Sequence, residues 1–285
     1  MATFKDEAIV LRAFDLGEAD RIISLITSAH GLRRAVARGI KRTRSKFGGR
    51  LEPFTQVRAV LHEGRNLDTV VQADVVRTHA ALRGDYARFL YGEAMLELIE
   101  KSLQERQEVP RLFDILRVTL DVLEGEVAEP PLLLAAFALK VCALIGYRPH
   151  LDCCLHCGRE VTGGQVFLDL AEGGVACPRC RPARGERVHL RPEALDLMRG
   201  LMRAEMAAVA RMGCIRPETA REALTASLGL AEAFLERPLR ARGVIMRHLA
   251  GDARRPCTAS GAGNARGGLP HPSADPEGEK KRNPS

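Results

Sequence analysis

Hydrophobic and polar residues alternate through the first eighty positions of the chain. Five short runs of this region resemble strands, at residues 8–14, 22–27, 32–38, 57–61 and 67–75; the run at 22–27 is marked by β-branched residues. Turn residues, among them Gly17, Gly31 and Gly64, separate these runs. A period of two puts successive side chains on opposite faces of a strand, and such punctuation is typical of tight turns. The pattern therefore predicts five β-strands.

Five short strands in so few residues indicate a small closed barrel, because closure leaves no strand edge exposed. The longest connection lies between the third and fourth strands and contains Gly48, Gly49 and Pro53. The oligonucleotide-binding (OB) fold is a five-stranded barrel with an additional element at that connection. We therefore predict an OB-fold domain over residues 1–80. An SH3-like barrel or a split sheet also fits the pattern.

The hydrophobic period becomes helical after about residue 80. Helical spacing is followed first by Phe89, Leu96, Ile99 and Leu103. Proline stands at positions 110, 130, 192 and 217, and proline is favoured in the first turn of a helix. The helix opened by Pro192 is predicted to include Val209, and a last segment reaches about Leu249. We predict an all-α domain over residues 81–250, which makes the chain an α+β multidomain protein.

The composition changes again at Gly251. Residues 251–285 are dominated by glycine, proline, serine, alanine and basic residues, with almost no large apolar side chain. Such a segment buries too little surface to offset the entropy lost on ordering. We therefore predict a disordered basic tail over residues 251–285.

Two C-x-x-C pairs lie between the helical segments, formed by Cys154, Cys157, Cys177 and Cys180. Nineteen residues separate the pairs, a spacing typical of sites where four thiolates hold Zn²⁺. Four protein ligands leave no position for a substrate, so we predict one structural zinc ion in a knuckle inserted at residues 153–187. Cys153 could replace Cys154 as a ligand, and His156 could replace a thiolate.

Positive charge is concentrated in one stretch of the chain. The net charge is +7. Between positions 33 and 50 there is no Asp or Glu, and the cations are Arg33, Arg34, Arg38, Lys41, Arg42, Arg44, Lys46 and Arg50. An unneutralised run of this kind favours an external polyanion, and a phosphate backbone fits best because its binding releases counterions. The eight residues are the candidate nucleic-acid-binding set, for DNA or RNA; a solvated basic loop is the alternative.

Signatures of several enzyme classes are absent from the sequence. There is no phosphate-binding G-x-x-x-x-G-K-[ST] loop, no G-x-S-x-G, no H-E-x-x-H and no H-x-E paired with the C-x-x-C. We therefore predict that the protein is not an enzyme. The longest apolar run, residues 132–145, is too short to span a bilayer, and the N-terminal residues do not resemble a signal peptide. Together with cysteines spaced for metal, these features predict a cytoplasmic protein.

Four segments of the chain resemble the bacterial RecO family of DNA-repair and recombination-mediator proteins. They are AIVLR with GEADRIISLIT and HG at residues 8–31, ARGIKRTRSKFGGRLEPF at 37–54, LKVCALIGYRPHLDCCLHCG with GGVACPRC between 139 and 180, and, more weakly, AEAFLERPLRAR at 231–242. The similarity extends over about residues 5–250. The tail is not part of the family pattern, and some members lack the zinc cysteines.

The resemblance implies an N-terminal OB fold, a helical domain and an inserted zinc knuckle. It also implies binding of single- and double-stranded DNA and annealing of complementary strands without ATP. The implied partners are RecR and the single-stranded-DNA-binding protein, with RecA loaded onto coated single strands. Two other functions fit the residues alone: a zinc-containing protein-interaction scaffold, and an RNA-binding or transcription-associated factor.

Overall fold

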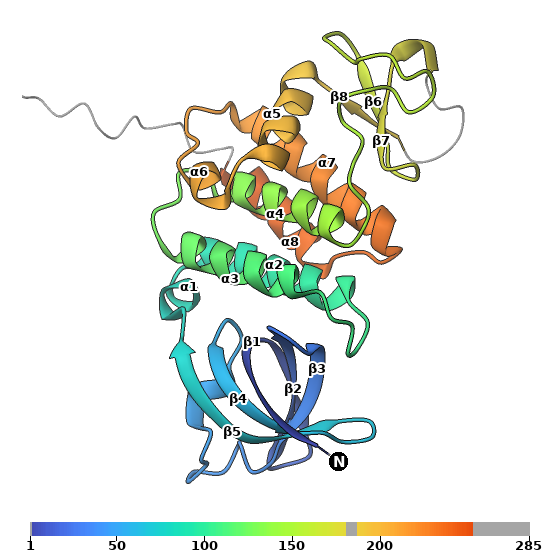
Figure 1. The fold of residues 1–285 in the computed structure, drawn as a ribbon. Helices are drawn as coiled ribbons and strands as arrows, with labels where there is room; N and C mark the ends of the chain where they lie inside the picture. Colours follow the sequence, from blue (N-terminus) through green and yellow to red (C-terminus); the bar gives the residue numbers. More distant parts are fainter. Residues whose placement is uncertain (1, 181–186, 253–285) are drawn as a thin grey trace, which may run out of the picture.

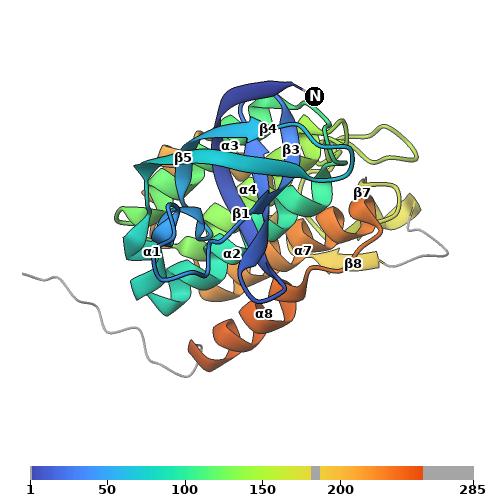
Figure 2. The same ribbon diagram turned by 90° about the horizontal axis from the view of Figure 1, so that it is seen from below.

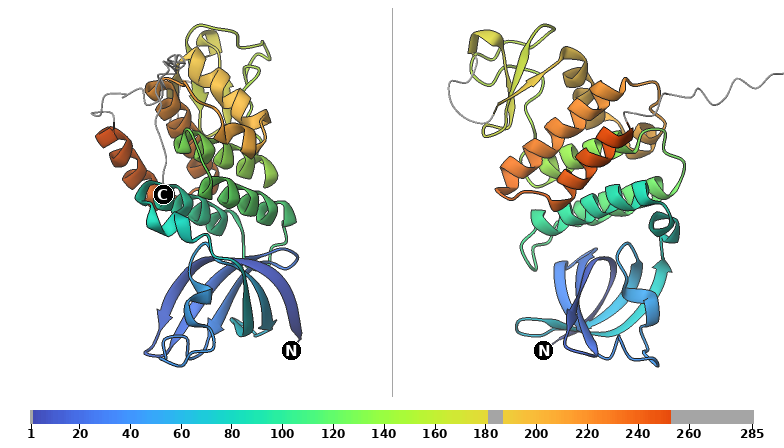
Figure 3. Two further views of the ribbon diagram at one scale, coloured as in Figure 1. Left: turned by 90° about the vertical axis from the view of Figure 1, so that its left-hand side faces the viewer. Right: turned by 180° about the vertical axis from the view of Figure 1, so that it is seen from behind.

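The computed structural model describes residues 2–180 and 187–252 of the chain. A β-barrel lies at one end of the molecule and a small three-stranded sheet at the other (Figures 1 and 3). Layers of helices lie between them. Among the described residues, no helix is long and apolar enough to cross a membrane.

The barrel contains the five predicted strands. They are β1 (Thr3–Leu16), β2 (Asp20–Thr27), β3 (Gly31–Ala37), β4 (Gln56–His62) and β5 (Asp68–Arg77). The barrel is closed in the order β1-β2-β3-β5-β4, with β3 parallel to β5 and the other pairs antiparallel. A short 3-10 helix, η1 (Gly48–Leu51), lies between β3 and β4. The predicted five-stranded OB-fold barrel is therefore confirmed.

Strand β1 carries apolar side chains on both faces. Ala8 and Val10 belong to the core inside the barrel, whereas Ile9 and Leu11 belong to the core of the helical layers. The pairing of β1 with β2 shifts register between Val10 and Arg12, as at a β-bulge. Figure 2 shows β1 against α2 (Tyr86–Ser102). One strand thus belongs to both cores and holds the barrel against the helices.

The helices begin largely where the proline pattern predicts. Besides α2, they are α1 (Ala80–Gly84), α3 (Pro110–Glu124), α4 (Pro130–Leu144), α5 (Pro192–Arg203), α6 (Met206–Ala210), α7 (Pro217–Leu235) and α8 (Arg240–Asp252). Helix α4 is buried on nearly every side, because α2, α3, α5, α6 and α7 surround it.

The prediction of one helix from Pro192 through Val209 is wrong. Ala204 and Glu205 have extended backbones, so α5 ends at Arg203 and a second helix, α6, contains Val209. The change in direction lets Val209 enter the core on α6, which contacts α3 and α4. At the other end, α8 includes Gly251, where the predicted tail begins; residues 253–285 of that tail lie outside the described residues.

The three-stranded sheet follows α4. Its strands are β6 (Val166–Asp169), β7 (Gly174–Ala176) and β8 (Arg187–Leu190), antiparallel in the order β7-β6-β8. A 3-10 turn, η2 (Pro178–Cys180), follows β7. Directly after β6, the Leu170 side chain lies against Gly229 of α7. The second cysteine pair, Cys177 and Cys180, directly follows the hairpin of β6 and β7.

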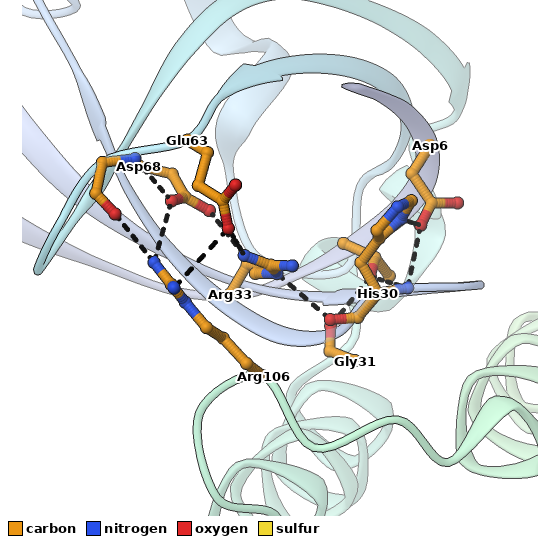
Figure 4. A network of polar contacts seen from close by, with 9 residues as sticks. Asp6, His30, Gly31, Arg33, Glu63, Asp68 and Arg106 are labelled. Carbon is orange, nitrogen blue, oxygen red and sulfur yellow. Dashed lines mark hydrogen bonds and ion pairs between the residues drawn. The ribbon is translucent and has the colours of Figure 1, made fainter. Parts of the chain in front are cut away.

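A second contact joins the barrel to the helices through the α2–α3 connection. The Arg106 backbone N–H donates to the Leu32 carbonyl of β3 at 2.8 Å, and its guanidinium donates to the Gly64 carbonyl at 2.7 Å. Figure 4 shows Arg106 reaching Glu63 in the β4–β5 connection and Asp68 at the start of β5. At Gly31 the backbone has φ +69°, and a Cβ there would lie 2.0 Å from the Gln107 carbonyl oxygen.

The close approach at Gly31 predicts the effect of adding a methyl group. Gly31→Ala should destabilise the protein by at least about 3 kcal/mol, because strain at positive φ adds to a collision with backbone. Gly17→Ala is the matched control, since Gly17 has φ +62° and nothing near its Cβ position. That change should cost only about 1 kcal/mol. Urea unfolding of both variants measures the difference, and equal losses would contradict a tight junction.

Candidate functional site

The basic segment begins on β3, with Arg33 and Arg34, and continues into the connection between β3 and β4, residues 38–55, which we name the basic loop. Three of its apolar side chains, Ile40, Phe47 and Leu51, are buried in the barrel core. The loop is also tied to the start of β2, because the Gly39 N–H donates to the Asp20 carboxylate at 2.7 Å. Since the apolar residues face inward, the cations between them are held on the surface.

Seven of the eight predicted DNA-binding residues are exposed: Arg34, Arg38, Lys41, Arg42, Arg44, Lys46 and Arg50. Arg33 is different, with only 7% of its surface exposed. Its guanidinium lies 3.4 Å from the Asp68 carboxylate and 3.6 Å from that of Glu63 (Figure 4). Asp68 is itself buried, so removal of Arg33 would leave a buried charge with fewer partners. Arg33 is thus held inside the barrel wall, apart from the exposed set.

The exposed cations divide into two groups by their partners. Lys41 pairs with Asp15 at 3.1 Å, while Lys46 and Arg50 donate to the Val71 and Ala73 carbonyls of β5 at 2.7 and 3.3 Å. Within the described part of the chain, no carboxylate pairs with the four others, which are Arg34, Arg38, Arg42 and Arg44. These four arginines offer their charge to solvent or to an external anion.

The four predicted cysteines lie together at the end of the three-stranded sheet. The sulfur atoms of Cys154, Cys157, Cys177 and Cys180 are all within 4.8 Å of one another. Cys154 is buried, and the Cys157 and Cys177 sulfurs are 3.9 Å apart. Tetrahedral thiolates about 2.3 Å from one ion would be separated by about 3.8 Å. The cluster therefore has the donor atoms and spacing to hold a metal ion.

The thiols of this cluster differ in acidity. Burial favours the neutral Cys154 thiol, but hydrogen bonds from the backbone N–H groups of Cys177 and Cys157 outweigh burial and lower its pKa to about 6. Hydrogen bonding with the Cys157 thiol, followed by burial and the nearby Cys177, raises the pKa of Cys180 to about 12. Thiolates this close repel one another, and a cation among them would offset that repulsion.

The first cysteine pair is held in place by backbone contacts and by one arginine of α5. The Leu155 N–H donates to the Val175 carbonyl of β7 at 2.9 Å, which joins the knuckle to the hairpin. The Arg199 guanidinium donates to the carbonyls of Leu151 at 3.0 Å and Val161 at 2.8 Å. Sequence reasoning missed Arg199, because an arginine in an amphipathic helix carries no signal of a partner forty residues away.

The alternative ligands lie outside the cluster. Neither Cys153 nor His156 belongs to the group of side chains that could share one ion. Cys153 is exposed and its backbone forms an isolated bridge with Glu160. His156 is exposed as well.

The fold and the site define a class of two-domain protein. Its first domain is a closed OB-fold barrel with a basic loop, and its second is a helical domain with a four-cysteine cluster. Comparison with known families is consistent with that class. Residues 1–79 match the model of the family described as recombination protein O N terminal, and residues 83–243 match that described as recombination protein O C terminal.

Individual relatives give the same result. The DNA repair protein RecO of Thermobifida fusca is 44% identical over 207 residues, 72% of this chain and 84% of that protein. RecO of Frankia casuarinae is 44% identical over 204 residues, 70% of this chain and 83% of that protein. RecO of Bifidobacterium longum is 34% identical over 247 residues, 86% of this chain and 99% of that protein. The chain belongs to the RecO family of DNA repair proteins.

The cysteine geometry predicts the outcome of removing two sulfurs. Cys177→Ser with Cys180→Ser should abolish metal binding and lower the Tm by about 5–10 °C, because metal binding is linked to folding. Cys153→Ser is the matched control and should keep both properties. Metal content by mass spectrometry and thermal unfolding check this. One metal ion retained per double-variant chain would show that other residues bind it.

Proposed function

We propose that the protein is a non-enzymatic recombination mediator that binds single- and double-stranded DNA through the basic loop. It anneals complementary strands without ATP. With RecR and the single-stranded-DNA-binding protein, it helps to load the recombinase RecA onto coated single strands. The observation that carries the DNA-binding part is the group of four exposed arginines without a carboxylate partner in the described chain. Family membership supports the role in DNA repair.

The electrostatics of the basic loop favour a phosphate backbone. A surface arginine that is paired within the protein has less to gain from an external anion, so the unpaired ones contribute most. Each phosphate neutralised releases condensed counterions, which gives affinity without base recognition. Binding through these residues is therefore expected to be independent of sequence, because phosphate contacts carry no base information.

Annealing follows from the same charges. Two complementary strands repel each other through their phosphates, and a cationic surface that holds both reduces that repulsion. Base pairing then supplies the free energy of the product, so the reaction needs no nucleotide hydrolysis. This mechanism requires only exposed positive charge on a folded surface. The buried side chains of Ile40, Phe47 and Leu51 hold the basic loop on the barrel.

The other regions take supporting roles in this proposal. We assign DNA binding to the barrel domain, residues 1–80, and partner contacts to the helical domain, residues 81–250. Zinc is the metal proposed for the cysteine cluster, since four thiolates suit Zn²⁺ and leave no open position for catalysis. Arg199 and the β6–β7 hairpin hold the knuckle, so zinc would stabilise the fold there.

Annealing of complementary single strands tests the proposal directly. The strands are first coated with the single-stranded-DNA-binding protein, and no ATP is added. The loop variant, Arg38→Ala with Arg42→Ala and Arg44→Ala, should anneal at least about tenfold more slowly than the wild type, because three phosphate contacts are lost.

A charge-matched control separates the loop from net charge. Three exposed arginines of the helical layers, for which the structure records no ion pair, are replaced by alanine: Arg211, Arg216 and Arg221. This helix variant loses the same charge. Both variants are therefore also compared on uncoated strands, where the partner contacts assigned to the helical domain play no part, and there the helix variant should anneal at the wild-type rate. Equal slowing of both variants would assign the effect to overall charge, and no acceleration by folded wild-type protein would refute the mediator function.

A further inference from the structure

The outer face of the β1–β2–β3 sheet carries an exposed apolar row. Phe14 of β1 is opposite Ile22 of β2, and Ile22 is opposite Val36 of β3. Residues directly opposite one another in antiparallel strands share a face. Ile22 and Val36 are half-buried, whereas Phe14 is 43% exposed. The row therefore offers solvent a phenyl ring supported by two aliphatic side chains.

This row is the part of the outer face that the helices leave uncovered. Toward the other end of the same strands, Ile9, Leu11, Ile26 and Leu32 are buried against the helical layers. The Arg12 guanidinium lies at the boundary, 3.5 Å from Glu100 of α2 and 5.7 Å from the centroid of the Phe14 ring. Beyond that point the outward-facing side chains of the row are half-buried or exposed.

Positive charge borders the apolar row on β3. Arg34 and Arg38 stand two residues before and after Val36, and both are exposed without a carboxylate partner in the described chain. The nearby carboxylates of Asp15 and Glu52 are each paired with Arg21, at 3.1 and 3.0 Å. The ring on β1 and the unpaired arginines that flank Val36 on β3 are two strands apart, about 10 Å. This arrangement suits an extended ligand that has both π faces and phosphates.

We infer that Phe14, with Ile22 and Val36, forms a stacking subsite for unstacked bases of single-stranded DNA, while Arg34 and Arg38 hold the adjoining phosphates. The inference rests on the proposed DNA-binding function and adds to it a preference for single strands. In a duplex the base faces are already stacked on one another, so no base face is free to stack on the Phe14 ring. Stacking on an aromatic side chain tolerates any base, as annealing of arbitrary sequences requires.

A single substitution makes the subsite observable by fluorescence. The chain contains no tryptophan, so Phe14→Trp introduces one indole at the proposed stacking position. Oligothymidine should quench the emission of this variant, whereas a blunt duplex with the same number of phosphates should not. Val118→Trp is the matched control, because Val118 is 36% exposed on α3, away from the strands that the basic loop contacts. Its emission should not change with either DNA.

Affinities complete the test. By fluorescence anisotropy, Phe14→Ala should lose roughly 5-fold to 150-fold in affinity for oligothymidine, the range for one stacked base. Its affinity for the duplex and for an abasic strand of equal length should be unchanged, since neither offers a free base. Val118→Ala should bind all three as the wild type does.

Three outcomes would overturn the inference. In the first, anisotropy shows that oligothymidine is bound to Phe14→Trp, but the tryptophan emission is not quenched. In the second, Phe14→Ala loses as much affinity for the duplex as for the single strand. Both would leave phosphate binding by the basic loop intact. The third is wild-type protein that binds no DNA at all, which would refute the proposed function and the subsite together.

Discussion

Apolar packing on both faces of β1 is the contact on which the arrangement of this protein depends. Ala8 and Val10 fill the barrel, while Ile9 and Leu11 pack on the helices. Each fully buried aliphatic side chain contributes about 1.5–3 kcal/mol, so the strand is a strong link between the two cores. Because the strand is shared, the barrel is fixed at one end of the molecule, with only part of its outer face covered.

That constraint determines which surfaces remain for function. The helices cover the half of the β1–β2–β3 face that contains Ile26 and Leu32, and the Arg106 connection adds a second attachment. The uncovered half adjoins the basic loop, whose apolar anchors hold its cations outward. Phosphate contacts and base contacts would then come from neighbouring parts of one surface. The β6–β7 hairpin, next to the cysteine cluster, lies at the far end of the helical layers (Figure 1).

Local patterns in the sequence were enough to predict much of this structure. The period of two predicted all five strands, and proline at helix starts predicted α3, α4, α5 and α7. The C-x-x-C pairs predicted the cluster because each pair is a local turn. The extended Ala204–Glu205 break was missed, since nothing in the helical period marks it.

Contacts between distant segments could not be predicted in this way. Arg33 and Arg34 are equivalent in the sequence pattern. The partners of Arg33, however, are thirty or more residues away: Glu63 follows β4 and Asp68 begins β5. The exposure of Phe14 depends on where α2 stops covering β1. In both cases the deciding contact is tertiary, and alternation along one strand reports only which residues share a face.

The salt dependence of DNA affinity tests most directly the central claim, that unpaired cations of the basic loop bind phosphates. For about five phosphates on a single strand, the slope of log K against log salt should be near −3.5. In the variant lacking Arg38, Arg42 and Arg44, the slope should be shallower by about 2, because three contacts are lost. The helix variant should keep the wild-type slope. Identical slopes for the wild type and the loop variant would contradict the account.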